Sequence, residues 1–307
     1  MSNCVAKKSI ILYDGSIQET VVRPAISDFI ALTKPTIMLL VLFTGATALV
    51  LEGSLLHDPI RFTLVLLGLF LTGGSANALN QVFERSIDAR MSRTRRRRPL
   101  PLGKLTVAQA LTFSVAIGVI GVALFAYFFN WLTALLALAT ILFYSLVYTL
   151  LLKPHTTQNI VIGGIAGAMA PVGAWAAATG GTALAPWLLF LIVVVWTPPH
   201  FWALALICKD DYATAQLPML PVVKGDDATY RQILIYTVVL VGVSLAMMAV
   251  GAGLVYLVPA LALGGWFVVK VRQSERRRTP AALHGLFGYS IIYLFALFIA
   301  VMLDRVI

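Results

Sequence analysis

The chain has 307 residues, of which 60% are hydrophobic and only 12% charged, a composition outside the usual range of soluble domains. Its formal net charge is +10, but the charges lie between long apolar stretches. The positive excess therefore indicates membrane topology and contact with anionic lipid or substrate, and nucleic-acid binding is not expected.

Six stretches contain no Asp, Glu, Lys or Arg, and each is long enough to cross a bilayer at least once. They are continuously apolar rather than alternating, which favours helices over a membrane barrel. The predicted fold is therefore all-α, a polytopic membrane helix bundle of about nine transmembrane helices. Breaks at Gly, Pro and polar residues place the spans near 36–51, 62–82, 107–126, 131–151, 160–178, 185–206, 233–252, 254–270 and 283–303.

A cytoplasmic N-terminus would place all but two of the 23 Lys and Arg residues, Arg61 and Arg305, inside or at the inner membrane edge. This asymmetry follows the positive-inside rule and sets the predicted orientation. Residues 1–28 are predicted to be a cytoplasmic tail rather than a signal or transit peptide. A bacterial inner membrane is the simplest location and a mitochondrial one the second. No disulfide is expected, because Cys4 and Cys208 would both face the cytoplasm.

Asn80, Glu84 and Asp88 recur every four residues between the second and third predicted spans. If the second helix continues past the membrane edge, they lie on one face and offer hard oxygen ligands that suit Mg²⁺ and a bound phosphate. The alternative is a solvated helix end in which the two acids pair with Arg85 or Arg90.

A run of basic residues follows, with Arg93 and four arginines at 95–98, then Pro99 and Lys104. Such a run is common as a topology anchor beside membrane helices. It also suits an anion clamp, because guanidinium groups bind diphosphate or carboxylate oxygens in pairs. Acids for a metal and bases for an anion at one membrane edge fit a metal–diphosphate substrate with a lipid tail.

A weaker copy of this pattern follows the sixth span, where Lys209, Asp210, Asp211 and Tyr212 precede a Pro218-x-x-Pro221 turn. The two copies lie four spans apart on the same predicted side. This indicates two four-helix halves plus a ninth helix, with a site between the halves.

Two further features lie within the predicted spans. Gly163-x-x-x-Gly167 is more typical of close helix approach than of ligand contact. His200 follows Pro198-Pro199 inside the sixth span, where ionisable groups are costly and often functional. Contact with a ligand, including haem coordination, and a local hydrogen bond at a helix break both remain open for His200.

These motifs together resemble the UbiA superfamily of intramembrane prenyltransferases and, within it, the protohaem IX farnesyltransferases, or haem O synthases. The resemblance covers roughly residues 30–305. The matching segments are Thr33-Lys34-Pro35, Asn80-x-x-x-Glu84-x-x-x-Asp88, Met91-x-Arg93-Thr94, Arg98-Pro99-Leu-Pro101-x-Gly103, Tyr148-Thr149, Asn159-Ile-Val-Ile-Gly163-Gly164, Pro198-Pro199-His200-Phe-Trp202, Asp211-Tyr212-x-x-Ala215, Pro218-Met-Leu-Pro221 and Tyr289-Ser290.

The resemblance implies that residues 29–307 form a prenyltransferase domain. This domain would transfer farnesyl from farnesyl diphosphate to a vinyl group of haem B, with water added, to give haem O. It implies Mg²⁺ on the catalytic residues Asn80, Glu84, Asp88 and Asp211. The implied substrate-binding residues are Lys34, Arg93, Arg97, Arg98, Tyr148, Lys153, His200, Trp202, Lys209 and Tyr212. Haem propionates could also contact the arginine run.

The aromatic side chains of Tyr144, Tyr148, Phe201 and Trp202 could each stabilise an allylic cation by about 0.5–2 kcal/mol. Besides both substrates and membrane lipid, haem A synthase or a terminal oxidase assembly are candidate partners.

The chain departs from the family pattern in two places. The arginine run is one residue longer, so either Arg97 or Arg98 fills the family position. The second acid motif has Ile207 and Ala215 where other superfamily members carry aspartates, which leaves Asp211. Prenyl transfer to an aromatic quinone precursor, and transport of lipid or haem without catalysis, remain as alternative functions.

Overall fold

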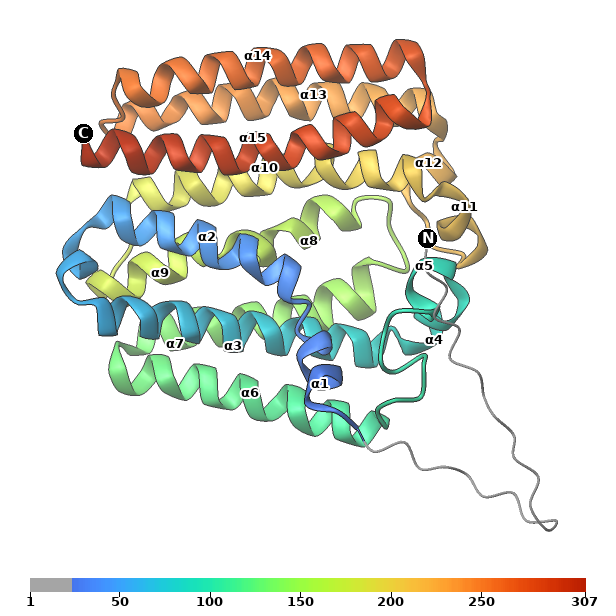
Figure 1. Cartoon of the computed structure of the whole chain (residues 1–307), viewed down its shortest axis with the longest axis horizontal. Coiled ribbons are helices and arrows are strands. Elements are labelled where there is room, and N and C mark those ends of the chain that lie inside the picture. Colours follow the sequence, from blue (N-terminus) through green and yellow to red (C-terminus); the bar gives the residue numbers. More distant parts are fainter. Residues whose placement is uncertain (1–23) are drawn as a thin grey trace.

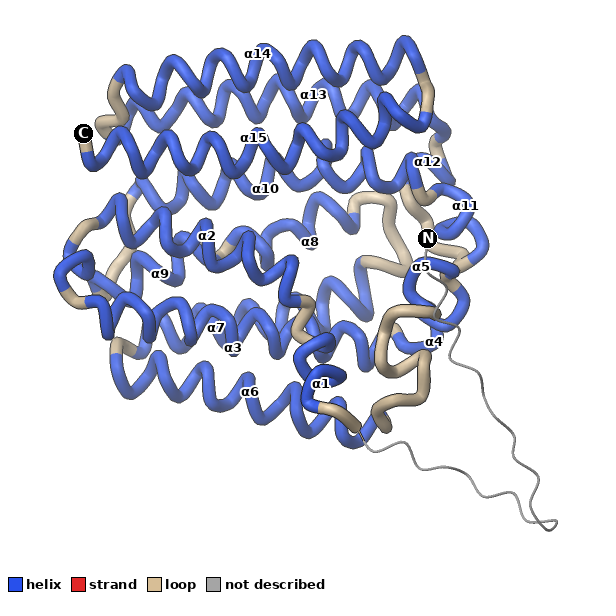
Figure 2. The backbone as a smooth tube through the Cα atoms, viewed as in Figure 1, coloured by secondary structure: helices blue, strands red, loops and turns tan. Residues whose placement is uncertain are grey.

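The computed structural model describes residues 24–307, and within this range the secondary structure consists of helices without strands (Figures 1 and 2). Nine helical segments of this range are long and apolar enough to cross a membrane, so the predicted all-helical, multi-pass fold is confirmed. The nine are α2 (Pro35–Glu52), α3 (Pro59–Phe83), α6 (Val107–Phe128), α7 (Trp131–Leu142) with η2 (Phe143–Leu152), α8 (Asn159–Ala168) with α9 (Ala170–Thr179), α10 (Leu184–Ile207), α13 (Gly225–Leu245) with η3 (Ala246–Val250), α14 (Leu254–Arg277) and α15 (Pro280–Val306).

Short helices occupy the connections between the spans. They are α1 (Ile26–Leu32), η1 (Ser54–His57), α4 (Arg85–Arg90), α5 (Ser92–Arg95), α11 (Lys209–Thr214) and α12 (Leu220–Val223). Figure 1 shows α4, α5, α11 and α12 gathered at one end of the bundle, while the C-terminus lies at the other. The two segments predicted to repeat, after the second and sixth spans, thus meet at the same end.

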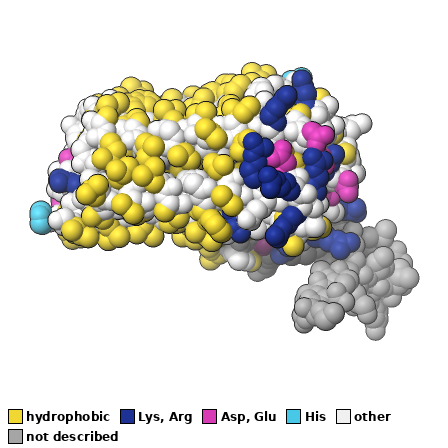
Figure 3. Space-filling model, turned by 90° about the horizontal axis from the view of Figure 1, so that it is seen from above, with side chains coloured by type: hydrophobic (Ala, Val, Ile, Leu, Met, Phe, Trp, Pro, Cys, Tyr) yellow, Lys and Arg dark blue, Asp and Glu magenta, His cyan; other side chains and the backbone are white. Residues whose placement is uncertain are grey.

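The spans close a ring of contacts around the bundle. Helix α3 packs against α2, α6 and α7, and α8 links η2 to α10. The ring continues through α13, α14 and α15, and α15 returns to α2. Figure 3 shows hydrophobic side chains over the length of the bundle and charged ones at its ends. Because water is absent from the hydrocarbon layer, this distribution matches a lipid-facing wall.

The helices extend beyond several predicted spans. The seventh begins at Gly225 rather than 233, and the eighth reaches Arg277 rather than 270. Hydropathy marks only the length of helix embedded in lipid, whereas backbone hydrogen bonds continue through charged residues. Helix α1 begins at Ile26, within the predicted tail of residues 1–28, and residues 1–23, including Cys4, lie outside the described residues.

Two spans contain irregular helix. The fourth changes at Phe143 into the π-helix η2, in which the amide of Lys153 bonds to the carbonyl of Tyr148 five residues earlier. The fifth is interrupted at Met169, where Pro171 lacks the amide hydrogen that a continuous helix needs. By contrast, α10 runs without interruption through Pro198 and Pro199.

The irregular η2 packs closely on α8. A Cβ added at Gly163 would lie 2.3 Å from the Tyr148 ring, whereas one at Gly167 would meet nothing within 4 Å. Close helix approach therefore uses the first glycine of the predicted pair and not the second.

This difference gives a matched test of stability. We expect Gly163→Ala to lower the free energy of unfolding by about 1–3 kcal/mol, because the new methyl group collides with a stacked aromatic ring. Gly167→Ala should be neutral or raise it by up to about 1 kcal/mol through helix propensity. Thermal denaturation of the purified protein in detergent measures both, and equal midpoints for the two variants would contradict this packing.

Candidate active site

The charged end of the bundle holds the predicted acid motif. Asn80 lies in the last turn of α3, Glu84 caps that helix, and Asp88 lies in α4. The amide of Glu84 donates to the carbonyl of Asn80, and that of Asp88 to Glu84, both at 2.9 Å. The four-residue hydrogen-bond step therefore continues across the boundary between α3 and α4. All three side chains are only 2% exposed, so the motif is buried at the membrane edge.

A cationic side chain meets each oxygen group of this motif. Lys153 donates to Glu84 Oε1 at 2.5 Å, and Lys34 donates to Asn80 Oδ1 at 2.8 Å. Arg98 pairs with Asp88, and its Nη1 also lies 3.8 Å from Glu84 Oε2. The alternative of a solvated helix end is therefore wrong: the acids are buried and pair with Lys153 and Arg98 rather than with Arg85 or Arg90.

Lys34 reaches Asn80 because the chain turns sharply between α1 and α2. Its backbone is left-handed, at φ 53°, a conformation that is uncommon outside glycine. Amide groups on α3 hold this turn: Asn77 donates to the carbonyl of Thr33, and Gln81 to those of Ala31 and Leu32. These carbonyls lie at the end of α1, where the regular helical bonds run out; that of Ala31 also accepts from the backbone amide of Lys34 at 3.3 Å. One face of α3 thus fixes the turn and the next carries the acid motif.

The π-helix places the partners that come from the fourth span. Thr149 donates its hydroxyl to the carbonyl of Tyr144, five residues back, at 2.8 Å. Its oxygen then accepts from Asn80 Nδ2 at 3.1 Å, which turns Asn80 Oδ1 towards Lys34. One turn later, Lys153 reaches Glu84. π-helical segments are rare and often lie at functional sites.

The pKa values of the two carboxyl groups shift in opposite directions. Burial raises the pKa of Glu84, but the charges of Lys153 and Lys34 outweigh this and hold its pKa below the ordinary value. Burial raises the pKa of Asp88 above its ordinary value, against the opposing charge of Arg98. Burial and the neighbouring Arg98 lower the pKa of Lys34 to about 7. Because the charged form of Lys34 is disfavoured in this way, a nearby anion would stabilise it.

The donor set fits a divalent cation. One cationic atom, Arg98 Nη1, contacts both Asp88 and Glu84, so the two carboxylates already converge on a common point that a positive charge occupies. Carboxylate and amide oxygens are ligands that Mg²⁺ accepts, with water and phosphate completing its shell. Asn80, Glu84 and Asp88 could therefore hold such an ion.

Asp211 lies on the facing segment but apart from this pair. Its carboxylate accepts hydrogen bonds from the Ser92 hydroxyl at 2.7 Å and from the Arg93 amide at 3.3 Å. The bond from Ser92, with a smaller contribution from Arg93, lowers the pKa of Asp211. Among residues 24–307, no three His, Cys, Asp or Glu side chains group to hold a metal. Asp211 therefore joins α11 to the start of α5. The predicted Lys209 pairs with Asp226 at 2.7 Å.

The predicted aromatic residues lie in two groups. Tyr144 and Tyr148 stack at 5.2 Å between ring centroids, one to two turns from Lys153 on the membrane side. Tyr212 is buried, and burial raises its pKa. On α10, Trp202 is 1% exposed and its indole N–H has no hydrogen-bond partner in the described chain, while Phe201 is 40% exposed.

His200 is enclosed between two helices. Its Nδ1 bonds to the Ser290 hydroxyl at 2.7 Å, and its ring stacks between Trp196 and Phe287 at 4.4 and 4.6 Å. The bond that His200 makes therefore ties α10 to α15 and does not repair a helix break. It lies about two helical turns on the membrane side of Cys208.

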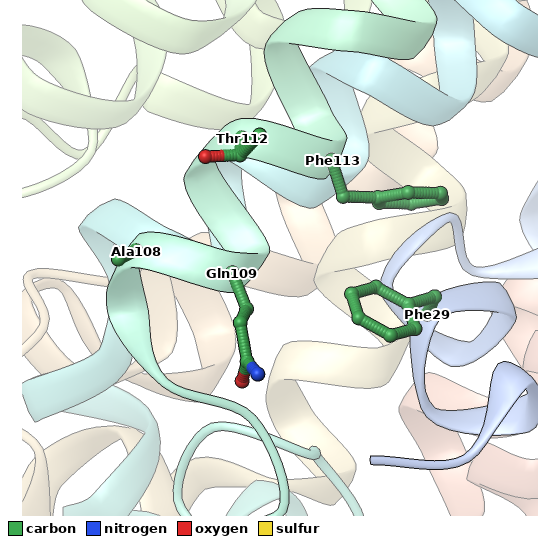
Figure 4. Close-up of a pocket in the computed structure, with 5 residues that line it drawn as sticks. All are labelled: Phe29, Ala108, Gln109, Thr112 and Phe113. Atoms are coloured by element: carbon green, nitrogen blue, oxygen red, sulfur yellow. The ribbon is translucent and has the colours of Figure 1, made fainter.

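Two recesses open near the charged end. The first, with a volume of about 440 Å³, lies on the flank between α1 and α6, where Phe29 approaches Phe113 at 5.2 Å (Figure 4). Its lining has no charged side chain and offers nothing to a diphosphate. The second, of about 270 Å³, is lined by Ala31, Lys34, Ile37, Gln81, Arg93, Thr94, Arg97, Arg98 and Pro99.

Sequence reasoning did not place four side chains that organise the site. Thr149 and Ser92 bond to Asn80 and Asp211, and Gln81 holds the α1–α2 turn. Asn159, fully buried, donates to the carbonyls of Lys153 and Thr156 and so fixes the loop after η2. Thr149 and Asn159 belong to segments that carry the family resemblance, and that was the only signal for them.

Comparison with known proteins gives concordant results. The protein named Protoheme IX farnesyltransferase from Rhodopseudomonas palustris (strain HaA2) is 47% identical to this chain, and the alignment covers 92% of this chain and 91% of the relative. The protein of that name from Gloeobacter violaceus is 46% identical, with 92% and 93% covered.

Solved structures show the same fold at low identity. A digeranylgeranylglyceryl phosphate synthase aligns with a TM-score of 0.75 at 17% identity, covering 91% of this chain and 98% of that one. A UbiA homolog from Archaeoglobus fulgidus bound to DMAPP and Mg²⁺ aligns with a TM-score of 0.61 at 15% identity, covering 89% and 99%. The sequence pattern described as the UbiA prenyltransferase family matches residues 41–301, and the chain therefore belongs to that family.

Proposed function

We propose that this membrane protein transfers the farnesyl group of farnesyl diphosphate to a vinyl group of haem B, with water added, to give haem O. The observation that carries the proposal is the buried motif of Asn80, Glu84 and Asp88, with Lys153 and Arg98 beside it. The printed name of the relatives, Protoheme IX farnesyltransferase, supports the choice of both substrates.

In this proposal Asn80, Glu84 and Asp88 hold Mg²⁺, which is supported by their oxygen groups and by the convergence of the Glu84 and Asp88 carboxylates on Arg98 Nη1. When bound, Mg²⁺ supplies positive charge that offsets the charge developing on the departing diphosphate. Lys153 and Arg98 bind the diphosphate oxygens directly, because both are placed at the acids and remain 17–18% accessible. Lys34 adds positive charge from the α1–α2 turn. Asp211 bonds to Ser92 at the start of α5 and so holds α11 beside the site.

The allylic carbon lies on the membrane side of these charges. As its bond to the diphosphate oxygen breaks, the leaving group keeps the electron pair, and the stacked Tyr144 and Tyr148 rings face the developing cation. The vinyl carbon of haem B supplies the electrons for the new bond, and water adds to the other vinyl carbon and loses a proton. The surrounding helices exclude bulk water until the carbon–carbon bond forms.

The basic end lies in the cytoplasm of a bacterial cell, with the N-terminus on the same side, in accordance with the positive-inside rule. Mass analysis of products from haem B and from 4-hydroxybenzoate separates this activity from prenylation of a quinone precursor. A flux assay in liposomes separates it from the other alternative, transport of lipid or haem without catalysis.

Neutralising one carboxylate tests the metal–diphosphate role. We expect Glu84→Gln and Asp88→Asn each to lower turnover about a hundredfold or more, because each removes a negative ligand where charge develops. The amide replacements keep the side-chain shape, so a buried cation is not left facing a cavity. Farnesylated haem is measured by mass spectrometry with purified protein, farnesyl diphosphate and Mg²⁺.

The matched control is Asp210→Asn, which removes the same charge from an exposed position at the same end. It should retain activity. Undiminished activity in either acid variant, or in wild-type protein with excess chelator, would refute the role of the motif.

Thr149→Val tests whether the π-helix orients Asn80. Without the hydroxyl, Asn80 Nδ2 loses its acceptor and the amide can turn its oxygen away from the ion. We expect the Mg²⁺ concentration for half-maximal activity to rise about tenfold, as for other groups that orient metal ligands. Electron paramagnetic resonance of Mn²⁺ binding gives a second measure that does not depend on turnover.

Thr149→Ser keeps the hydroxyl and should behave like the wild type in both measurements. A Thr149→Val protein that binds metal normally and is only less stable would show that this bond serves packing alone.

A further inference from the structure

The pocket of about 270 Å³ beside the acid motif has an unusual charge. We call it the arginine pocket; it lies between the start of α2 and the segment after α4, and its lining was given above. Four of its nine lining residues are Lys or Arg, and none is Asp or Glu. Neither Glu84 nor Asp88 reaches it, so Lys34 and Arg98 stand between the pocket and the acids.

Most of this positive charge is not compensated. Lys34 bonds only to the neutral amide of Asn80, and Arg98 is turned towards the acids. The side chains of Arg93 and Arg97 form no ion pair or hydrogen bond within residues 24–307. Arg97 therefore faces this small space without an acidic partner, Lys34 meets only a neutral amide, and the charge of Arg93 acts on Asp211 without a direct ion pair. This arrangement favours an anionic ligand.

A buried amide adds a polar group to the same pocket. Gln81 is 2% exposed, and its Nε2 is fixed by the carbonyls of Ala31 and Leu32. This leaves Oε1 as an acceptor with no partner in the described chain.

The pocket also opens at the membrane edge. Ile37, in the first turn of the α2 span, is 51% exposed and forms part of the lining. An amphiphilic ligand could therefore keep its apolar part against the bundle while its acid groups reach Arg93 and Arg97. The absence of carboxylates among the lining residues distinguishes this space from the metal–diphosphate site, because it provides no negatively charged ligand for a cation.

We propose that the arginine pocket binds the propionate carboxylates of the acceptor substrate, separately from the diphosphate. The inference rests on the proposed function, in which the acceptor is haem B with two propionate groups. Arg97 and Arg93 lie four residues apart and would each hold a carboxylate, since guanidinium groups pair with carboxylates through two parallel hydrogen bonds.

The test compares free acid and ester. Purified protein in phosphatidylcholine nanodiscs is assayed with farnesyl diphosphate and either haem B or its dimethyl ester. We expect Arg97→Gln to raise KM for haem B about tenfold, the loss of a charged hydrogen-bonded contact. With the dimethyl ester as acceptor, Arg97→Gln and the wild type should have the same KM. The KM of the variant for farnesyl diphosphate should differ from that of the wild type by less than about twofold. Titration of the haem absorbance without farnesyl diphosphate gives the binding change directly.

Arg96→Gln is the matched control, because Arg96 is an equally exposed neighbour that does not line the pocket. It should match the wild type with both acceptors, and Arg97→Lys should fall between wild type and Arg97→Gln. Thermal denaturation confirms that each variant is folded.

Three results would overturn the proposal: a KM increase for farnesyl diphosphate in Arg97→Gln, equal effects on acid and ester, or equal effects of Arg96→Gln and Arg97→Gln. An effect seen only when phosphatidylglycerol is present would assign the pocket to lipid headgroups and also overturn it. If the wild type forms no farnesylated haem, the proposed function fails; product formation with unchanged KM values in the variants rejects the pocket alone.

Discussion

The ion pairs of Glu84 and Asp88 with Lys153 and Arg98 hold together three parts of the chain that are far apart in sequence. Removing one partner from a buried pair costs about 3–5 kcal/mol, because the other charge is left uncompensated. The π-helix and the arginine segment must therefore close on the end of α3 in one arrangement. The position of Lys34, through Asn80, is tied to the same arrangement.

The membrane sets where this cluster can lie. A charged side chain at the bilayer centre costs at least about 2.5 kcal/mol, whereas at the edge water and lipid headgroups reduce that cost. Glu84 and Asp88 lie just beyond the apolar length of α3, where the free-energy cost of a charged side chain is lower than within the bilayer. The buried polar residues earlier in α3 are uncharged, and they include Ser75, Asn77 and Gln81, whose side chains donate hydrogen bonds to backbone carbonyls. Towards its C-terminal end, α3 thus changes from apolar residues to uncharged polar residues and then to acids.

Sequence patterns predicted the helical fold, the nine spans and the four-residue step of the acid motif, because each depends on local composition or periodicity. They did not predict the partners of the acids. Lys153 lies 69 residues from Glu84, and only the packing of η2 on α3 brings it there. The π-helical register of η2 has no periodic signature in the sequence, so the role of Thr149 was not visible. His200 was ambiguous because its partner, Ser290, lies 90 residues away.

The cations that pair with the acids in this structure, Arg98 and Lys153, are also the ones that would bind the diphosphate in the proposed reaction. Arg98 and Lys153 already lie where a diphosphate must approach the motif, and both reach the acids through flexible side chains. If a metal bound to Glu84 and Asp88, the side chains of Arg98 and Lys153 could bind phosphate oxygens instead of these carboxylates. Neither the acids nor the cations are then left uncompensated in either state, which avoids the large cost of an unpaired buried charge. The side chains of Arg97 and Arg93 form no ion pair with a carboxylate in the described chain, and this difference is why these two arginines are better suited to a second anion than to the diphosphate.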